Sequence, residues 1–129
     1  MTEVRYFSRS GNTKVIAEAI AQAAGTQAKD VETPLSGRAD VLFLGGALYA
    51  GGIAGKLKKF IKTTNPELAG TVAVFSTAAN PDGAYAKIRK WLEQYGFRVL
   101  EREFHCLGKD AKGKDAALRA GVFAKEILG

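Results

Sequence analysis

The sequence contains only one cysteine and one histidine among its 129 residues. A single cysteine cannot form a disulfide within the chain, so a disulfide-stabilised scaffold is excluded. The same scarcity argues against a structural zinc site, which needs four cysteine or histidine ligands. We therefore expect no metal site, and a fold stabilised by its apolar core alone.

Long apolar runs are also missing. No stretch approaches the ~20 apolar residues that a membrane-spanning helix needs. Residues 1–5 lack the basic and then apolar layout of a signal peptide. We expect a cytoplasmic protein without a membrane span. The length suits a single domain that covers residues 1–129.

Positive charge exceeds negative charge, with 19 lysines and arginines against 13 aspartates and glutamates and a net charge of +6. The positive residues are scattered along the chain, and the densest group lies between Lys56 and Lys62. We interpret this group as the solvated face of a helix, because no helix-turn-helix pattern, zinc-ligand spacing or aromatic stripe indicates nucleic acid. The net charge favours acidic partners.

Apolar strands alternate with helices along the chain. Strands are predicted at residues 2–7, 28–32, 40–46, 71–76 and 97–106. Helices are predicted from apolar residues at helical spacing in 15–23, 53–61, 88–95 and 116–127. This alternation predicts a doubly wound α/β domain: a three-layer α/β/α sandwich with a five-stranded parallel sheet. Because no helix is predicted between the second and third strands, we expect the strand order 2-1-3-4-5.

Three loops should meet at one edge of this sheet. They span residues 8–13, 46–55 and 76–83, and they follow the first, third and fourth strands. Ligands of doubly wound sheets bind outside the carboxyl ends of the strands, near the point where the strand order reverses. We expect the functional site there.

The first of these loops has the composition of a phosphate-binding loop. Ser8, Ser10 and Thr13 offer hydroxyl groups and Asn12 an amide, while Gly11 allows a tight turn. A helix that begins here adds unpaired N–H groups and a positive dipole end. The alternative is a helix N-cap that is rich in serine and threonine. Donors at four of six positions exceed what capping needs, so we favour phosphate.

The segment Ser8-Arg9-Ser10-Gly11-Asn12-Thr13 resembles the [ST]-x-[ST]-G-N-T phosphate loop of the flavodoxins. Residues 46–52 and 76–83 lie where that family has its two ring-binding loops. The resemblance covers nearly the whole chain and is to short-chain flavodoxins. It implies non-covalently bound FMN, with no catalytic residue and no metal in the site.

The resemblance also assigns residues to the cofactor. Those for the phosphate are Ser8, Arg9, Ser10, Gly11, Asn12 and Thr13, and those for the isoalloxazine ring are Ala47, Leu48, Tyr49, Ala50, Gly51, Ser76, Thr77, Ala78, Ala79, Asn80 and Gly83. Tyr49 is the candidate for an aromatic surface against the ring. Tyr85 is the alternative, although packing in the first turn of its helix suits it better. The resemblance further implies that a peptide within 50–52 turns over when the flavin is reduced.

This resemblance implies an electron carrier that passes electrons between redox partners. The net charge of +6 departs from the many strongly acidic flavodoxins, so we expect acidic surfaces on those partners. We also expect a monomer. Two alternatives remain open. Residues 46–53 and 58–61 also resemble flavodoxin-like protoporphyrinogen dehydrogenases, which would make the chain an FMN-dependent oxidoreductase acting on a quinone or porphyrinogen. A flavin-free interaction module is the third hypothesis. His105 and Cys106 are adjacent on a strand and therefore face opposite ways, so they are poorly placed to act as a nucleophile–base pair. For Cys106 we favour structural packing over catalysis.

Overall fold

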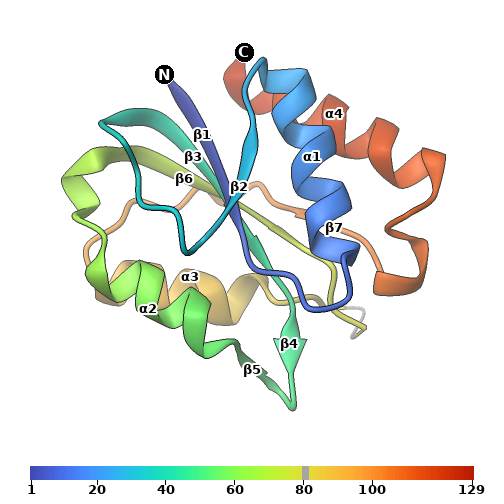
Figure 1. Cartoon of the computed structure of the whole chain (residues 1–129), viewed down its shortest axis with the longest axis horizontal. Helices are drawn as coiled ribbons and strands as arrows, with labels where there is room; N and C mark the ends of the chain where they lie inside the picture. Colours follow the sequence, from blue (N-terminus) through green and yellow to red (C-terminus); the bar gives the residue numbers. More distant parts are fainter. Residues whose placement is uncertain (80–81) are drawn as a thin grey trace.

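Five parallel strands form the central sheet of the computed structural model, which describes residues 1–79 and 82–129. The strands lie in the order β2-β1-β3-β6-β7 (Figure 1). Their bounds are β1 Thr2–Tyr6, β2 Ala28–Asp30, β3 Ala39–Gly46, β6 Ala69–Ser76 and β7 Phe104–His105. Within this sheet the chain order is 2-1-3-4-5, and every neighbouring pair is parallel. The predicted fold class is confirmed.

Helices cover both faces of the sheet, which gives the three expected layers (Figure 1). Helices α1 (Asn12–Ala24) and α4 (Lys114–Leu128) pack against each other on one face. Helices α2 (Gly55–Thr63) and α3 (Tyr85–Gln94) lie on the other face. No helix in the described part of the chain is long and apolar enough to cross a membrane.

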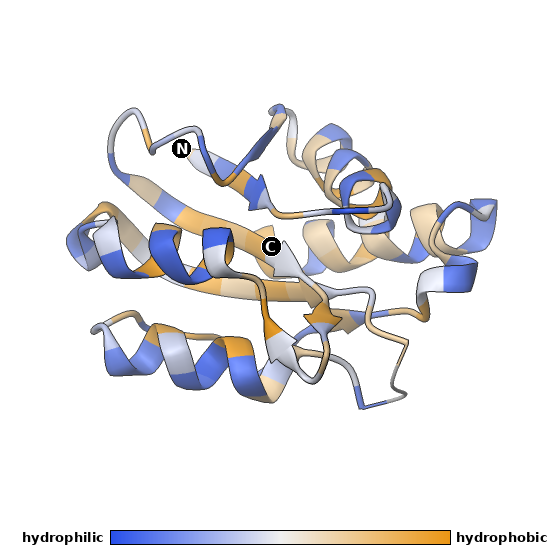
Figure 2. Ribbon diagram, turned by 60° about the horizontal axis from the view of Figure 1, so that its bottom comes forward, coloured by the Kyte–Doolittle hydropathy of each residue, from blue (hydrophilic) through white to orange (hydrophobic). Residues whose placement is uncertain are grey.

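The strands bury side chains on both faces because helices cover both. Along β3, Leu42 and Leu44 belong to the core under α2 and α3, whereas Phe43 belongs to the core under α1 and α4. This alternation is the two-residue period of a strand. Figure 2 shows the strands as largely hydrophobic, with hydrophilic residues on the outward sides of the helices. The continuous apolar run at 41–44 is therefore explained by burial from both sides.

The last strand is much shorter than residues 97–106, and that prediction is wrong. Val99 forms an isolated bridge with Val72, and regular pairing returns only at β7. The irregular residues between them include three consecutive charged positions, 101–103. Strand β7 lies at the edge of the sheet, where an interruption leaves fewer backbone groups without partners than it would in a central strand.

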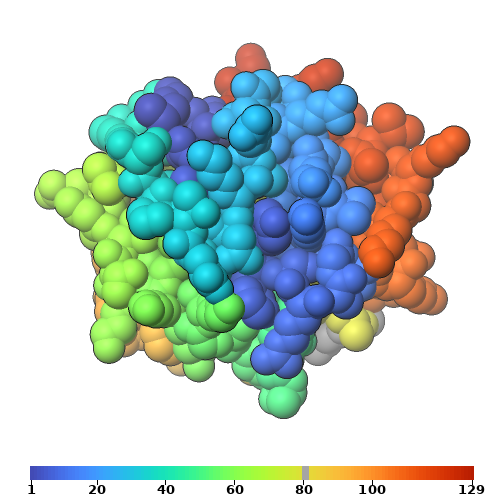
Figure 3. Space-filling model, in the orientation of Figure 1, coloured from blue at the N-terminus to red at the C-terminus, as the bar shows by residue number. Residues whose placement is uncertain are grey.

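The chain passes from β2 to β3 without a helix, as predicted, through turns and bends at residues 31–38. This segment lies across the face seen in Figure 3. The guanidinium of Arg5, on β1, anchors the segment by hydrogen bonds. Arg5 Nε donates to Thr33 O at 2.8 Å and Nη2 donates to Pro34 O at 2.9 Å, while Nη1 donates to Glu3 Oε1 at 2.8 Å. Arg5 is only 1% exposed.

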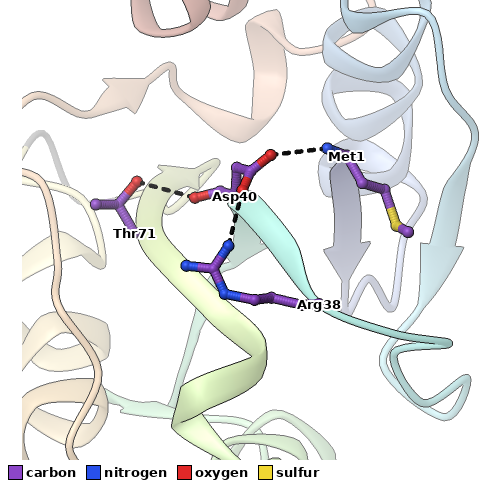
Figure 4. Close-up of polar contacts among 4 residues, drawn as sticks. All are labelled: Met1, Arg38, Asp40 and Thr71. Atoms are coloured by element: carbon purple, nitrogen blue, oxygen red, sulfur yellow. Dashed lines mark hydrogen bonds and ion pairs between the residues drawn. The ribbon is translucent and has the colours of Figure 1, made fainter.

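A second polar cluster ties strands together at the amino-terminal edge of the sheet. The Asp40 carboxylate accepts from the Met1 ammonium at 2.9 Å and from Arg38 Nη1 at 2.8 Å (Figure 4). The Thr71 hydroxyl donates to the Asp40 carbonyl at 3.5 Å. The Met1 ammonium and Arg38 hold the pKa of the Asp40 carboxyl below its usual value. These ion pairs are exposed, so they contribute little to stability.

We expect the substitution Arg5→Met to destabilise the protein by about 3–5 kcal/mol, because it leaves the Glu3 carboxylate buried without its partner. It also removes the donors for two carbonyls of the 31–38 segment. Urea unfolding followed by circular dichroism measures the effect. Arg38→Met is the matched control, since Arg38 forms an exposed ion pair and should change the midpoint little. Equal midpoints for the two variants would contradict the anchoring role of Arg5.

Candidate functional site

A short hairpin projects beyond the carboxyl end of β3 (Figure 1). Its antiparallel strands are β4 Leu48–Tyr49 and β5 Gly52–Ile53. The two turn residues are left-handed, with φ of +51° at Ala50 and +81° at Gly51. Positive φ at both positions is the signature of the two-residue type I′ hairpin. The sequence predicted only a glycine-rich loop here.

The three predicted loops meet beside this hairpin around a cavity of about 520 Å³. Its described lining residues are Ser10, Asn12, Thr13, Ala47, Leu48, Tyr49, Thr77, Ala78, Ala79, Leu107, Gly108 and Lys109. The volume lies within the ~300–1,000 Å³ that is typical of sites for small organic ligands. Hydroxyl and amide groups line one part of the cavity, and apolar side chains of the second and third loops line another.

The part of the cavity that is lined by hydroxyl and amide groups is built on the start of α1. Gly11, with φ of +92°, precedes the helix, and no side chain caps the helix by a hydrogen bond. The first turn contains no acidic residue. Its N–H groups and positive dipole end are therefore available to an anion. Ser8 shapes the loop instead of lining the cavity, because its Oγ accepts from the Gly11 N–H at 3.0 Å.

Tyr49 connects the second loop to the phosphate loop. Its hydroxyl accepts from the Arg9 backbone N–H at 3.3 Å, and the Arg9 guanidinium lies 4.2 Å from the ring centroid. Phe7 meets the Tyr49 ring edge to face, with centroids 5.9 Å apart. These contacts hold the ring in the cavity wall. A flat aromatic ligand could stack on such a surface.

The third loop is attached to both other parts of the site. The hydroxyls of Thr13 and Thr77, both buried, lie 2.6 Å apart. Buried Ser76 does not line the cavity; its Oγ accepts from the Ala84 N–H at 3.3 Å and closes the loop. Gly83, with a left-handed φ of +72°, directly precedes Ala84. The predicted contact at Asn80 lies outside the described residues.

The structure thus separates the predicted site residues into two groups. The loop residues that line the cavity are Ser10, Asn12, Thr13, Ala47, Leu48, Tyr49, Thr77, Ala78 and Ala79. The described residues that shape or flank it are Ser8, Arg9, Gly11, Ala50, Gly51, Ser76 and Gly83. In the second group, Ser8, Ser76 and Arg9 contact neighbouring loop residues. The other four residues contribute a left-handed backbone conformation.

Sequence reasoning missed a fourth segment, the loop after β7. Leu107, Gly108 and Lys109 line the cavity. Lys112 lies close by, and its ammonium donates to the Ser10 carbonyl at 3.5 Å. The same argument that assembled the other three loops applies to this one, because β7 also ends at this edge of the sheet. Two lysines, Lys109 and Lys112, are therefore near the start of α1.

A family model described as a flavodoxin domain matches residues 4–109. The chain belongs to the flavodoxin domain family. Among curated proteins, none matches the sequence significantly.

Solved structures related to this flavodoxin-family chain agree in fold. A flavodoxin from the domain Archaea is 19% identical, covers 99% of both chains and has a TM-score of 0.70. Flavodoxin 2 from Bacillus cereus is 20% identical, with a TM-score of 0.71, and the match covers 98% of this chain and 97% of that flavodoxin. A flavoprotein from Lactobacillus acidophilus, solved in complex with FMN, is 17% identical over 84% of this chain and 94% of its own, with a TM-score of 0.66.

The remaining candidates have structural roles in this flavodoxin-family chain. Cys106 is buried in the core under α1 and α4, and burial raises the pKa of its thiol. His105 lies toward the third loop, with Nε2 3.4 Å from the Ala78 carbonyl. Tyr85 does not line the cavity; its hydroxyl donates to Leu100 O at 2.8 Å and its ring packs on the core. The packing alternative for Tyr85 is the one that the structure favours.

Thr13→Val should destabilise the ligand-free protein by about 1–3 kcal/mol, because it leaves the buried Thr77 hydroxyl without its partner. Thr13→Ser keeps the hydroxyl and is the matched control. The double variant Thr13→Val/Thr77→Val should cost less than the sum of the single variants. Thermal unfolding of the unsubstituted chain, Thr13→Val, Thr77→Val and the double variant measures this coupling, and strictly additive effects would show that the hydroxyl pair does not stabilise the site.

Proposed function

We propose that this chain is an electron carrier that binds FMN non-covalently in the cavity at the carboxyl edge of its sheet. The observation that carries the proposal is the cavity itself: a hydroxyl-rich helix start without a capping side chain, facing an aromatic and apolar wall. The first part suits a phosphate monoester and the second a flat ring. Membership of the flavodoxin family supports the same ligand.

In this proposal each part of the cavity has one task. Ser10, Asn12 and Thr13, with the first-turn N–H groups of α1, would hold the phosphate. Tyr49 and the 77–79 segment would enclose the ring and keep water from it. FMN supplies the redox chemistry, since it takes up and releases electrons singly or in pairs, and the protein supplies binding, orientation and electrostatics.

The turn of the hairpin is a further element of the site. The Gly51 carbonyl accepts a hydrogen bond from the Lys87 ammonium of α3. A left-handed glycine can rearrange its peptide without a Cβ clash. We propose that residues 50–52 adjust to the redox state of the ring, and that Lys87 restrains one of their two arrangements.

The whole chain, residues 1–129, would act as one electron-transfer unit. A cytoplasmic location belongs to the proposal; the chain has one buried cysteine and needs no disulfide, so a reducing compartment is permitted.

Titration of the purified protein with FMN, followed by absorbance and fluorescence, tests the cofactor. Saturable binding is expected, with much weaker binding of riboflavin, which lacks the phosphate. Ser10→Ala should weaken FMN binding by about tenfold or more, because it removes a hydrogen bond to a charged group. Ser36→Ala, at an exposed position of the 31–38 segment, is the control. Equal affinities for FMN and riboflavin would overturn the phosphate assignment.

Lys112→Met should lower FMN affinity at low ionic strength, and the difference from the unsubstituted chain should shrink as salt is added. Riboflavin binding should not change. Lys125→Met, on α4, removes an equal charge away from the cavity and serves as the control. A loss that is independent of salt would show that Lys112 acts by packing and not by its charge.

A further inference from the structure

The net positive charge of the chain is concentrated on one layer of the fold. Helices α2 and α3 together contain seven lysines and arginines and a single glutamate. Their excess of six charges equals the net charge of the whole chain, so the other residues balance to zero. The excess positive charge is thus gathered in space, although the basic residues are spread along the sequence, because the second basic helix packs beside the first.

Three of these lysines surround one recess. A hollow of about 410 Å³ is lined by Lys58 of α2 and by Lys87 and Lys90 of α3. Trp91 contributes an aromatic wall, with the Lys58 ammonium 5.0 Å from its ring centroid. None of the described lining residues is acidic. The one glutamate of the two helices, Glu93, forms an ion pair with Arg89 at 3.2 Å, so it does not compensate these lysines.

The recess shares a wall with the proposed cofactor cavity. Leu48 and Tyr49 of the hairpin line the cavity, whereas Gly52 and Ile53 line the recess. Lys87 also links the two sites, because its ammonium donates to the Gly51 carbonyl at the hairpin turn. An anion bound in the recess would therefore lie one hairpin away from the ring of the cofactor.

We propose that the recess formed by Lys58, Lys87, Lys90 and Trp91 is the docking surface for an acidic redox partner protein, whose carboxylates enter it beside the hairpin. The proposal rests on the proposed function, because the hairpin matters to electron transfer only if the cavity holds FMN. Charge complementarity of this kind speeds encounter and fixes orientation.

Two features favour a protein over a membrane. The recess is concave and suits protruding carboxylate side chains, whereas a bilayer presents a flat surface. Membrane-surface helices insert large apolar side chains. The large apolar side chains that are exposed among the described residues are Met1, Leu118, Val122 and Leu128, and all lie outside α2 and α3.

Carboxylate binding in the recess would also compete with the Gly51 carbonyl for the Lys87 ammonium. A docked partner would thereby release the hairpin turn, so docking and the arrangement of residues 50–52 are coupled. The ammonium has three N–H groups but one position, so a carboxylate that draws it into the recess weakens its hydrogen bond to the Gly51 carbonyl.

The test measures binding of a fluorescein-labelled octaglutamate peptide by anisotropy at low ionic strength. Lys58→Gln/Lys87→Gln/Lys90→Gln should weaken binding by about tenfold or more. The control Lys29→Gln/Lys114→Gln/Lys125→Gln removes the same charge from β2 and α4, and should change the affinity by no more than about twofold. The double variant Lys87→Gln/Lys90→Gln, at two exposed positions, provides a second measurement if the triple variant folds poorly.

Equal losses in the triple variant and its control would overturn the proposal, since binding would then follow net charge alone. Preferential binding of phosphatidylserine vesicles or duplex RNA through the same lysines would overturn it in favour of those partners. FMN titration of the same variants separates the two hypotheses. Octaglutamate binding at the recess without FMN binding would leave the docking surface standing and remove the proposed electron transfer.

Discussion

Among the described residues, the buried guanidinium of Arg5 fixes the one connection between consecutive strands of the central sheet that contains no helix, the segment from β2 to β3. Arg5 is the largest fully buried side chain among the described residues. A guanidinium can be buried only if its donors find acceptors, and here two loop carbonyls and the Glu3 carboxylate supply them. The interaction replaces the packing that a helix would provide, and it anchors the 31–38 segment to β1, the strand that leads into the loop at residues 8–13.

The same connection leaves a hollow of about 740 Å³ between the 31–38 segment and α2. The Lys56–Glu32 ion pair joins its two sides, and Lys56 holds the pKa of the Glu32 carboxyl below its usual value. The pair is exposed and contributes little stability. Arg5, and not this ion pair, therefore secures the segment.

Local pattern was enough to predict the layers and the first part of the site. The spacing of Ile16 and Ile20 indicated α1, and the run at 41–44 indicated a strand covered on both faces. The hydroxyls of Ser10 and Thr13 indicated a phosphate site because they follow the first strand directly. These signals lie within a few residues of one another, so tertiary structure was not needed to read them.

What could not be predicted depends on residues that are far apart in sequence or on unusual backbone conformations. Ala50 has a left-handed backbone, which alanine rarely adopts. The first turn position therefore lacks the asparagine, aspartate or glycine that usually indicates such a hairpin. Lys112 reaches a loop about a hundred positions earlier in the chain. The recess needs side chains of two helices and a hairpin at once. Each of these features follows from packing and not from local propensity.

The distribution of charge has a consequence for how the molecule moves in solution. Because six excess charges lie on α2 and α3, the centre of charge is displaced toward one side of the sheet. The molecule therefore carries a permanent electric dipole directed through that layer. In the field of an anionic protein such a dipole experiences a torque, and it turns the layer of α2 and α3 toward that protein before the two surfaces touch.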